Sequence, residues 1–212
     1  MEKFDGIIFD LDGTLWDTID SCVKTLSEVK NKYSDILYDI SAEEIKNTMG
    51  LPFDEIVKIY YGYLDKEKAE KYTKEAFNRN VDNLLKNGGT LYPKLQETIK
   101  ELSKYFKLCI VSNCIEGYIE SFLNTSMLND YFCDYESHGK TKLTKGENIK
   151  LVIERNHLKN AIYVGDTQGD KSAATYAGIP FMYASYGFGN VIEYDYKLNE
   201  ISEILKVLNI NT

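Results

Sequence analysis

Residues 6–9 form a short apolar segment that ends in two aspartates, Asp10 and Asp12, and Gly13 follows them at once. An apolar run that stops at a turn residue predicts a buried strand. In open α/β folds the last residues of such a strand lie at the carboxyl edge of the sheet, where ligands bind. Two carboxylates repel each other there unless a cation or a proton lies between them. The pattern therefore predicts metal-assisted chemistry with a carboxylate nucleophile.

The part of the chain after residue 90 alternates strands with helices. Apolar runs predict strands at 108–112, 131–134, 161–165 and 180–184. Apolar residues at helical spacing predict helices at about 95–102, 116–124, 147–156, 169–177 and 201–208. Because this alternation is typical of parallel strands with crossover helices, the sequence predicts a doubly wound, Rossmann-like α/β sheet.

A block with helical spacing only lies between the first strand and this alternating part. Helices are predicted at about 17–31, 41–50, 52–61 and 65–86. Ser41 and Glu44 have the spacing of a capping box, and Gly50 is placed to end that helix. We expect residues 16–89 to form a small helical cap domain, inserted into a core domain made of residues 1–15 and 90–212.

Composition excludes several classes of function. The net charge of −8 argues against wrapping nucleic acid, which requires a basic surface. No apolar run approaches the ~20 residues needed to span a bilayer, and residues 1–5 lead into the first strand without a leader pattern. We expect a cytoplasmic protein, monomeric or homodimeric, that binds neither nucleic acid nor membrane. The four cysteines form no CxxC pair and are expected to be buried, reduced thiols.

Polar residues at the ends of three expected strands resemble a known family. The motifs are Asp10 to Thr14 (DxDGT), Ser112-Asn113 after an apolar strand, Lys145 in a loop before a helix, and Gly165-Asp166 with Asp170 (GDxxxD). In this order they resemble the haloacid dehalogenase-like hydrolase superfamily, and most of all its phosphoglycolate phosphatase-like group with a helical cap. The four motifs span nearly the whole chain, so the resemblance implies a phosphatase.

The resemblance also implies the roles of the acidic residues. Asp10 would attack phosphorus and form an aspartyl-phosphate, and Asp12 would protonate the leaving oxygen and then activate water. Mg²⁺ would be bound by the carboxylates of Asp10 and Asp166 and by the backbone carbonyl of Asp12. Asp170 would hold a water of the metal, or Lys145. Four aspartates and one lysine would repel a phosphate dianion, so the chemistry requires the metal.

The remaining motif residues would bind the phosphoryl group and the leaving group. The resemblance implies that Lys145, Ser112 and the backbone N–H of Asn113 contact the phosphoryl oxygens, with Asn113 near the N-terminus of the following helix. Residues 48–52 resemble the cap loop that reads the leaving group in this family, or they form a plain connection between two helices. The candidate substrate contacts in this loop are Met49, Gly50 and Leu51.

Several functions remain open at this stage. Phosphoglycolate is the leading substrate by resemblance, and sugar phosphates, pyrophosphate and nucleoside monophosphates are alternatives. A phosphomutase of the β-phosphoglucomutase kind would share all four motifs, and a catalytically silent regulatory module could keep the fold. A dehalogenase is disfavoured because it has no need of an acid at Asp12.

Overall fold

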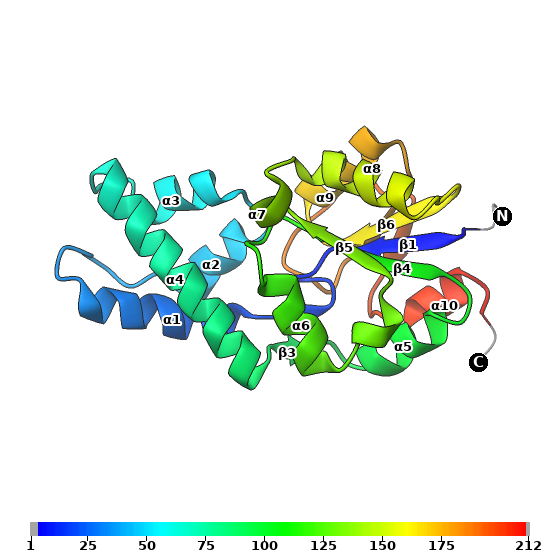
Figure 1. Ribbon diagram of the computed structural model, residues 1–212, viewed down its shortest axis with the longest axis horizontal. Helices are drawn as coiled ribbons and strands as arrows, with labels where there is room; N and C mark the ends of the chain where they lie inside the picture. The colour runs from blue at the N-terminus through cyan, green and yellow to red at the C-terminus, as the bar shows by residue number, and fades with distance from the viewer. Residues whose placement is uncertain (1–3, 211–212) are drawn as a thin grey trace.

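The computed structural model describes residues 4–210. The expectation of no leader rests partly on residues 1–3, which lie outside the described residues. Its main sheet has six parallel strands in the order β5-β4-β1-β6-β7-β8 (Figure 1). The strands are β1 (Gly6–Phe9), β4 (Lys107–Ser112), β5 (Asp134–Ser137), β6 (Ala161–Gly165), β7 (Phe181–Ala184) and β8 (Tyr196–Leu198). The prediction of a doubly wound parallel sheet is confirmed.

Helices cover both faces of the sheet. One face packs against α5 (Leu95–Leu102), α6 (Tyr118–Ser126) and α10 (Glu203–Val207), and the other packs against α8 (Lys145–Arg155) and α9 (Gln168–Ala177). Strand β1 lies in the centre, where Phe9 is in register with Ile110 of β4 and with Val164 of β6. The connections from these two neighbours run to opposite faces, which makes the end of β1 a topological switch point.

Four helices form a separate unit beside the sheet, at the left of Figure 1. They are α1 (Ile19–Lys32), α2 (Ala42–Thr48), α3 (Phe53–Tyr61) and α4 (Lys66–Asn87). Their buried side chains, such as Val29, Ile45 and Tyr61, make a hydrophobic cluster distinct from the two clusters on the sheet. We call α1–α4 the helical unit. The capping box at the start of α2 is present, with the Ser41 hydroxyl accepting from the Glu44 N–H.

The chain enters and leaves the helical unit through a short two-stranded ribbon. Strands β2 (Trp16–Asp17) and β3 (Thr90–Leu91) pair antiparallel, with Trp16 opposite Leu91. The Trp16 ring is fully buried and packs edge-on against Tyr118 and Phe122 of α6. The two crossings are therefore held together, and both are anchored to the core beneath them.

Several local predictions were wrong. Strand β5 is Asp134–Ser137 where the sequence predicts 131–134, because residues 129–131 form a 3-10 turn, η1 (Asn129–Tyr131). Polar residues dominate β5, so its apolar signal is displaced towards the preceding turn. Lys145 is the first residue of α8, not a loop residue, because Thr144 and Glu147 form a capping box one position earlier.

The shortest helices and strands were not predicted, and the expectation that all four cysteines are buried was wrong. The ribbon, β8 and the single-turn helix α7 (His138–Thr141) are too short to carry a periodic pattern. The cysteines are free, but only Cys109 is buried; Cys133 is exposed. Within residues 4–210, the structure has no helix that is both long enough and apolar enough to cross a membrane.

Candidate active site

Asp10 lies at the centre of the carboxyl edge of the sheet. Its backbone N–H donates to the carbonyl of Val164 at 2.8 Å, which continues the pairing of β1 with β6 by one residue. The side chain is 2% exposed. Its carboxylate meets those of Asp166 and Asp170, and the three groups offer oxygens that all lie within 4.8 Å of one another. Residues far apart in the sequence thus converge because parallel strands end at one edge.

Lys145 connects two of these carboxylates. Its ammonium donates to Asp10 Oδ1 at 2.9 Å and to Asp170 Oδ1 at 2.7 Å. Burial by itself would lower the pKa of Lys145, but the two carboxylates outweigh it and raise the pKa above its ordinary value. Lys145 is therefore charged at neutral pH, and its contact with Oδ1 orients Asp10.

The cluster has a charge deficit that a divalent cation would remove. Three carboxylates, those of Asp10, Asp166 and Asp170, face one ammonium. Burial, and then the charge of Asp170, raises the pKa of Asp166 to about 7 and raises that of Asp10 well above its usual range. Buried carboxylates with raised pKa values gain stability when a cation binds, and oxygen ligands suit Mg²⁺. The residues present fit such an ion.

The hydrogen bonds of Asp170 and Asp166 distinguish their parts in this cluster. Asp170 Oδ1 accepts from Lys145, and its Oδ2 accepts from the Thr167 N–H at 2.9 Å and the Thr167 hydroxyl at 2.6 Å. Both oxygens of Asp170 are thus in use. Asp166 Oδ2 accepts from the Phe188 N–H at 2.7 Å, whereas its Oδ1 has only a long contact of 3.4 Å from the Thr14 hydroxyl. Asp166 therefore has an oxygen free for a metal.

The loop that holds Asp166 was not singled out by the sequence. The backbone N–H groups of Phe188 and Gly189 donate to it, and Gly187 lies so close that a Cβ there would be 2.4 Å from the Cβ of Asp166. Gly13, at φ +81°, is equally close, because an added Cβ would lie 2.3 Å from Asp166 Oδ2. The glycine of the first motif thus serves both the turn and this close approach.

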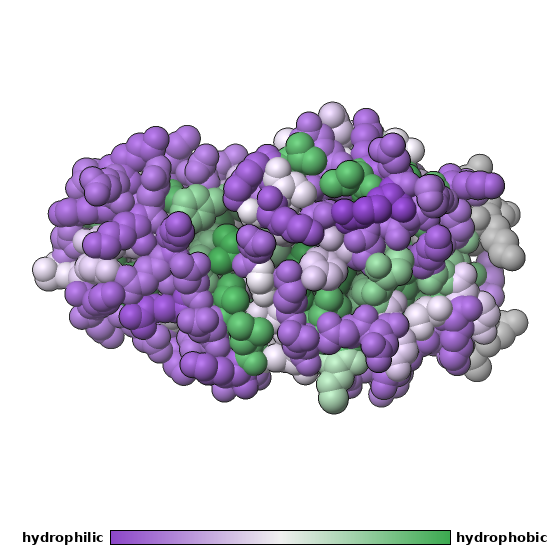
Figure 2. Space-filling view, viewed as in Figure 1, coloured by the Kyte–Doolittle hydropathy of each residue, from purple (hydrophilic) through white to green (hydrophobic). Residues whose placement is uncertain are grey.

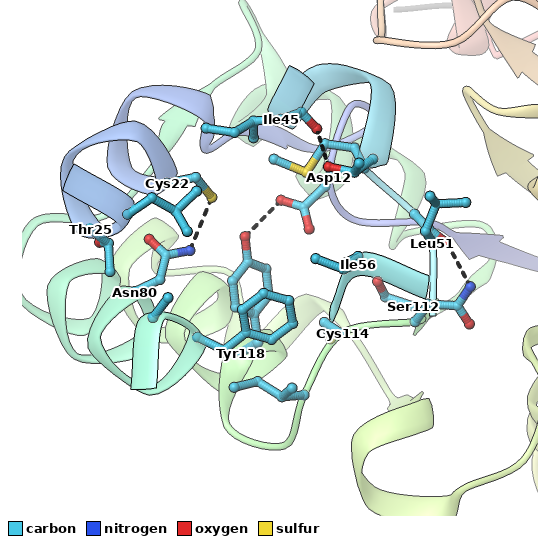
Figure 3. Close-up of a pocket in the computed structure, with 18 of the residues that line it drawn as sticks. Asp12, Cys22, Thr25, Ile45, Leu51, Ile56, Asn80, Ser112, Cys114 and Tyr118 are labelled. Atoms are coloured by element: carbon cyan, nitrogen blue, oxygen red, sulfur yellow. Dashed lines mark hydrogen bonds between the residues drawn. The ribbon is translucent and has the colours of Figure 1, made fainter. Parts of the chain in front are cut away.

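Asp12 is held by two hydroxyl groups. Tyr118 donates to Asp12 Oδ1 at 2.9 Å (Figure 3). Thr18 donates to the same oxygen at 2.8 Å, and the hydroxyl oxygens of Thr18 and Tyr118 are 2.9 Å apart. Burial raises the pKa of Asp12 to about 6, although both hydrogen bonds lower it. A carboxyl group with a pKa near neutrality can both give and take a proton. Tyr118 was missed because it comes from α6, and nothing local to it marks a role.

The end of β4 supplies Ser112 and Asn113. Ser112 is 5% exposed and lines the same site as Asp10. The amide Nδ2 of Asn113 donates to the carbonyl of Gly50 at 2.8 Å, and so it joins the core to the α2–α3 loop. Helix α6 begins at Tyr118, five residues after Asn113, so the expected role of the Asn113 N–H beside a helix N-terminus stays a prediction. The intervening turn belongs to Ile115 to Gly117.

A cavity of about 100 Å³ lies between these residues at the sheet edge and the helical unit. In Figure 3, Asp12 lies near the middle of the residues that line the cavity, with Tyr118 below it, Ile45 above it, and Cys22 and Asn80 at the left. Met49, Gly50 and Leu51 all line the cavity, as do Asp10, Ser112 and Asn113. The structure therefore brings the loop 49–51 to the site. Lys145 and Asp166 are buried and do not line the cavity.

The comparisons with known proteins decide the family. The sequence model described as haloacid dehalogenase-like hydrolase matches residues 7–184. The chain belongs to this family. The resemblance found in the four motifs is thereby confirmed, and so is the prediction of a phosphatase, since relatives over nearly the full length carry that name.

Two curated relatives of this hydrolase illustrate the range of names. The chain is 27% identical to a phosphoglycolate phosphatase of Aquifex aeolicus, covering 96% of both chains, and 26% identical to the pyrophosphatase PpaX of Anoxybacillus flavithermus, covering 97% of both. Among solved structures, a predicted phosphoglycolate phosphatase from Haemophilus somnus superposes with a TM-score of 0.85 at 22% identity, covering 98% of this chain and 99% of that one. At this identity the superposition supports the fold alone.

Proposed function

We propose that this hydrolase is a Mg²⁺-dependent phosphatase of small phosphomonoesters that works through an aspartyl-phosphate on Asp10. The observation that carries the proposal is the buried group of Asp10, Lys145, Asp166 and Asp170, with Asp12 held separately by Tyr118. A nucleophile, a fixed cation and a proton carrier with a pKa of about 6 are thus placed on one edge of the sheet.

In the first step, a carboxylate oxygen of Asp10 forms a bond to phosphorus and the bond from phosphorus to the ester oxygen breaks. Lys145 orients Asp10 by its contact with Oδ1. Asp12 gives its proton to the departing alkoxide, so that a neutral alcohol leaves. Ser112, which lines the site, is placed to donate to a phosphoryl oxygen.

In the second step, the ionised Asp12 takes a proton from water, and the water oxygen bonds to phosphorus. The bond between phosphorus and Asp10 breaks, which releases inorganic phosphate and restores both carboxyl groups. The hydroxyls of Thr18 and Tyr118 hold Asp12 in one orientation through both steps. The same carboxyl therefore acts as acid and then as base, as its pKa near neutrality allows.

The metal would be held by Asp10, Asp166 and the backbone carbonyl of Asp12. When bound, Mg²⁺ neutralises charge on the phosphoryl oxygens so that an anionic nucleophile can approach. Asp170 lies beside these residues but has both oxygens engaged by Lys145 and Thr167. It is a positioning residue for Lys145 and for the start of α9.

The helical unit would act as the cap over this site, and the cap domain would run from residue 16 to residue 89. Three observations support this role: its own hydrophobic cluster, the paired crossings of the ribbon, and the contact between Asn113 and Gly50. A cap that closes over the cavity excludes water from the nucleophile during the first step. The loop 49–51 would contact the leaving group.

The first experiment is a phosphate-release assay with purified protein, Mg²⁺ and a panel of phosphorylated metabolites. Phosphoglycolate and pyrophosphate head the panel because the two curated relatives carry those names. We expect Mg²⁺-dependent release of phosphate that a chelator abolishes and that added Mg²⁺ restores. Full turnover in metal-free buffer, or silence of the folded protein towards every ester with Mg²⁺ present, would overturn the proposal. Isomerisation of a sugar 1-phosphate without phosphate release would identify a mutase instead.

A further inference from the structure

We infer that the cavity selects a phosphomonoester whose leaving group is uncharged and largely apolar, in preference to one carrying a carboxylate or a second phosphate. This inference rests on the proposed function and narrows its substrate class. It comes from the side of the cavity that the helical unit supplies, which is where the leaving group would lie when the phosphoryl group faces Asp10.

The first observation is the absence of cations. Of the described residues that line the cavity, none is Lys, Arg or His. The only charged side chains among them are Asp10 and Asp12, which are negative when ionised. Lys145 and the metal ligands serve the phosphoryl end, so a carboxylate or phosphate on the leaving group would be desolvated on the helical unit's side of the cavity with no positive partner there. Burying an unpaired charge is strongly unfavourable, so the cavity should bind an ester with an anionic leaving group more weakly than one with a neutral leaving group.

The second observation is where the cations of the helical unit lie. Lys32 and Arg79 both pair with Glu75, and Lys68 pairs with Asp35. Each of these cations is 41% exposed or more, so the pairs belong to the outer surface. Figure 2 agrees with this division, since hydrophilic residues cover the outer face of the helical unit and apolar residues gather at its boundary with the core.

The third observation is that the polar groups on the helical unit's side of the cavity are neutral and already make hydrogen bonds within the protein. The amide of Asn80 accepts from the Ser21 hydroxyl at 2.6 Å and donates to the sulfur of Cys22 at 3.3 Å (Figure 3). Thr48 bonds to the hydroxyl of Tyr60. Burial raises the pKa values of the Cys22 thiol and the Tyr60 hydroxyl to about 12, so both stay neutral.

These groups define what the leaving group can be. An amide has two N–H donors, and the contact with a sulfur leaves the Asn80 amide able to donate to one hydroxyl or carbonyl of a ligand. The rest of the wall is apolar, with Leu26, Ile45 and Ile56 among its members. The cavity measures about 100 Å³, and an apolar protein cavity of about 150 Å³ holds a benzene ring. A leaving group of about four heavy atoms therefore fits.

The test compares three esters with the same number of heavy atoms. Phosphoglycolate carries a carboxylate, 2-(phosphonooxy)acetamide replaces it by a neutral amide, and isobutyl phosphate replaces it by an isopropyl group. We expect kcat/KM with Mg²⁺ to be at least about tenfold higher for the amide and the isobutyl ester than for phosphoglycolate. Isobutanol is the poorest leaving group of the three, so a preference for it comes from the cavity and not from intrinsic reactivity.

The outcomes separate the inference from the proposed function. If phosphoglycolate reacts as fast as its neutral analogues or faster, the inference is overturned and the phosphatase stands. If the folded protein with Mg²⁺ releases phosphate from none of the three esters and none from p-nitrophenyl phosphate, the proposed function falls and the inference falls with it. Faster reaction of the neutral esters supports both.

A pair of variants tests the cause of the selectivity. Met49 lines the cavity at the end of α2, is partly exposed and packs at the margin of the helical unit's hydrophobic cluster, so the folding of both variants is checked by thermal unfolding. We expect Met49→Lys to shift the ratio of kcat/KM towards phosphoglycolate by about tenfold or more. Met49→Gln, similar in length but neutral, should leave the ratio within about twofold. An unchanged ratio in a folded Met49→Lys protein overturns the claim that charge in the cavity sets the choice.

Discussion

The two walls of the cavity differ in charge. The wall at the sheet edge includes Asp10 and Asp12. Behind it, Asp10 meets the buried carboxylates of Asp166 and Asp170, and Lys145 pairs with Asp10 and Asp170. The opposite wall, from the helical unit, is apolar with neutral polar groups. In the proposed mechanism, the residues at the sheet edge carry out phosphoryl transfer. The helical unit's wall takes no part in bond breaking in this proposal, so one wall would set the type of reaction and the other the choice of substrate.

The largest effect should follow removal of the nucleophile from the charged wall. Asp10→Asn keeps the shape of the side chain but leaves a far poorer nucleophile, so we expect kcat to fall by at least about 10⁴-fold. Steady-state phosphate release on the best ester measures it. Asp130→Asn, on the exposed turn η1, is the matched control and should retain full activity. An active Asp10→Asn enzyme would remove Asp10 from the mechanism.

Metal binding should change stability in a way that depends on pH. The pKa values of Asp10, Asp12 and Asp166 are raised in the folded protein, with Asp166 at about 7 and Asp12 at about 6. The folded state therefore binds more protons than the unfolded state between about pH 4 and 7, and the metal-free protein loses stability as the pH rises through that window.

Mg²⁺ should reverse this trend. At a concentration 100-fold above its Kd it should add about 2.7 kcal/mol to the free energy of unfolding. The gain should be large at pH 7.5 and small at pH 5, where protons compete for the same carboxylates. Thermal unfolding with Mg²⁺ and with a chelator at both pH values measures it. An equal effect at both pH values would mean that the ion binds elsewhere.

The contact between α6 and Asp12 can be tested through the pH dependence of activity. Tyr118→Phe removes a hydrogen bond that favours the ionised form of Asp12, so the pKa of Asp12 should rise above about 6. The alkaline limb of the kcat/KM profile for an alkyl ester should move to higher pH, so that the value at pH 7 becomes a larger fraction of the maximum. Tyr105→Phe, at an exposed tyrosine, is the control. A lower rate with an unmoved profile would reduce Tyr118 to a packing role.

The smallest effect should come from the link between the walls. Asn113→Ala removes the hydrogen bond to Gly50, which is worth about 0.5–1.5 kcal/mol. We expect KM to rise by about threefold to tenfold with kcat nearly unchanged, since the contact positions the loop and not the reacting atoms. Asn124→Ala, at the exposed end of α6, is the control. A fall in kcat at constant KM would place Asn113 among the groups that touch the transition state.

The parts of the fold with long periodic patterns were predictable. The predicted helices at 17–31 and 65–86 correspond to α1 (Ile19–Lys32) and α4 (Lys66–Asn87). The buried strands β1 and β6 were placed because they are short apolar runs that end in turn residues. By contrast, β5 was displaced and β8 was missed, since polar or three-residue strands are formed by pairing with neighbours and have no pattern of their own.

The sequence by itself determined which residues stand at the sheet edge. Asp10, Ser112, Lys145 and Asp166 follow apolar strands or begin helices, and parallel strands bring such positions together whatever the details of packing. Only the tertiary structure decided how they are held and what they face. Tyr118 reaches Asp12 across 106 positions, and Asn113 reaches Gly50 across 63. Such contacts depend on how helices pack. The neutral wall depends on the packing that leaves no Lys, Arg or His among the described residues that line the cavity. Neither of these features leaves a local pattern in the chain.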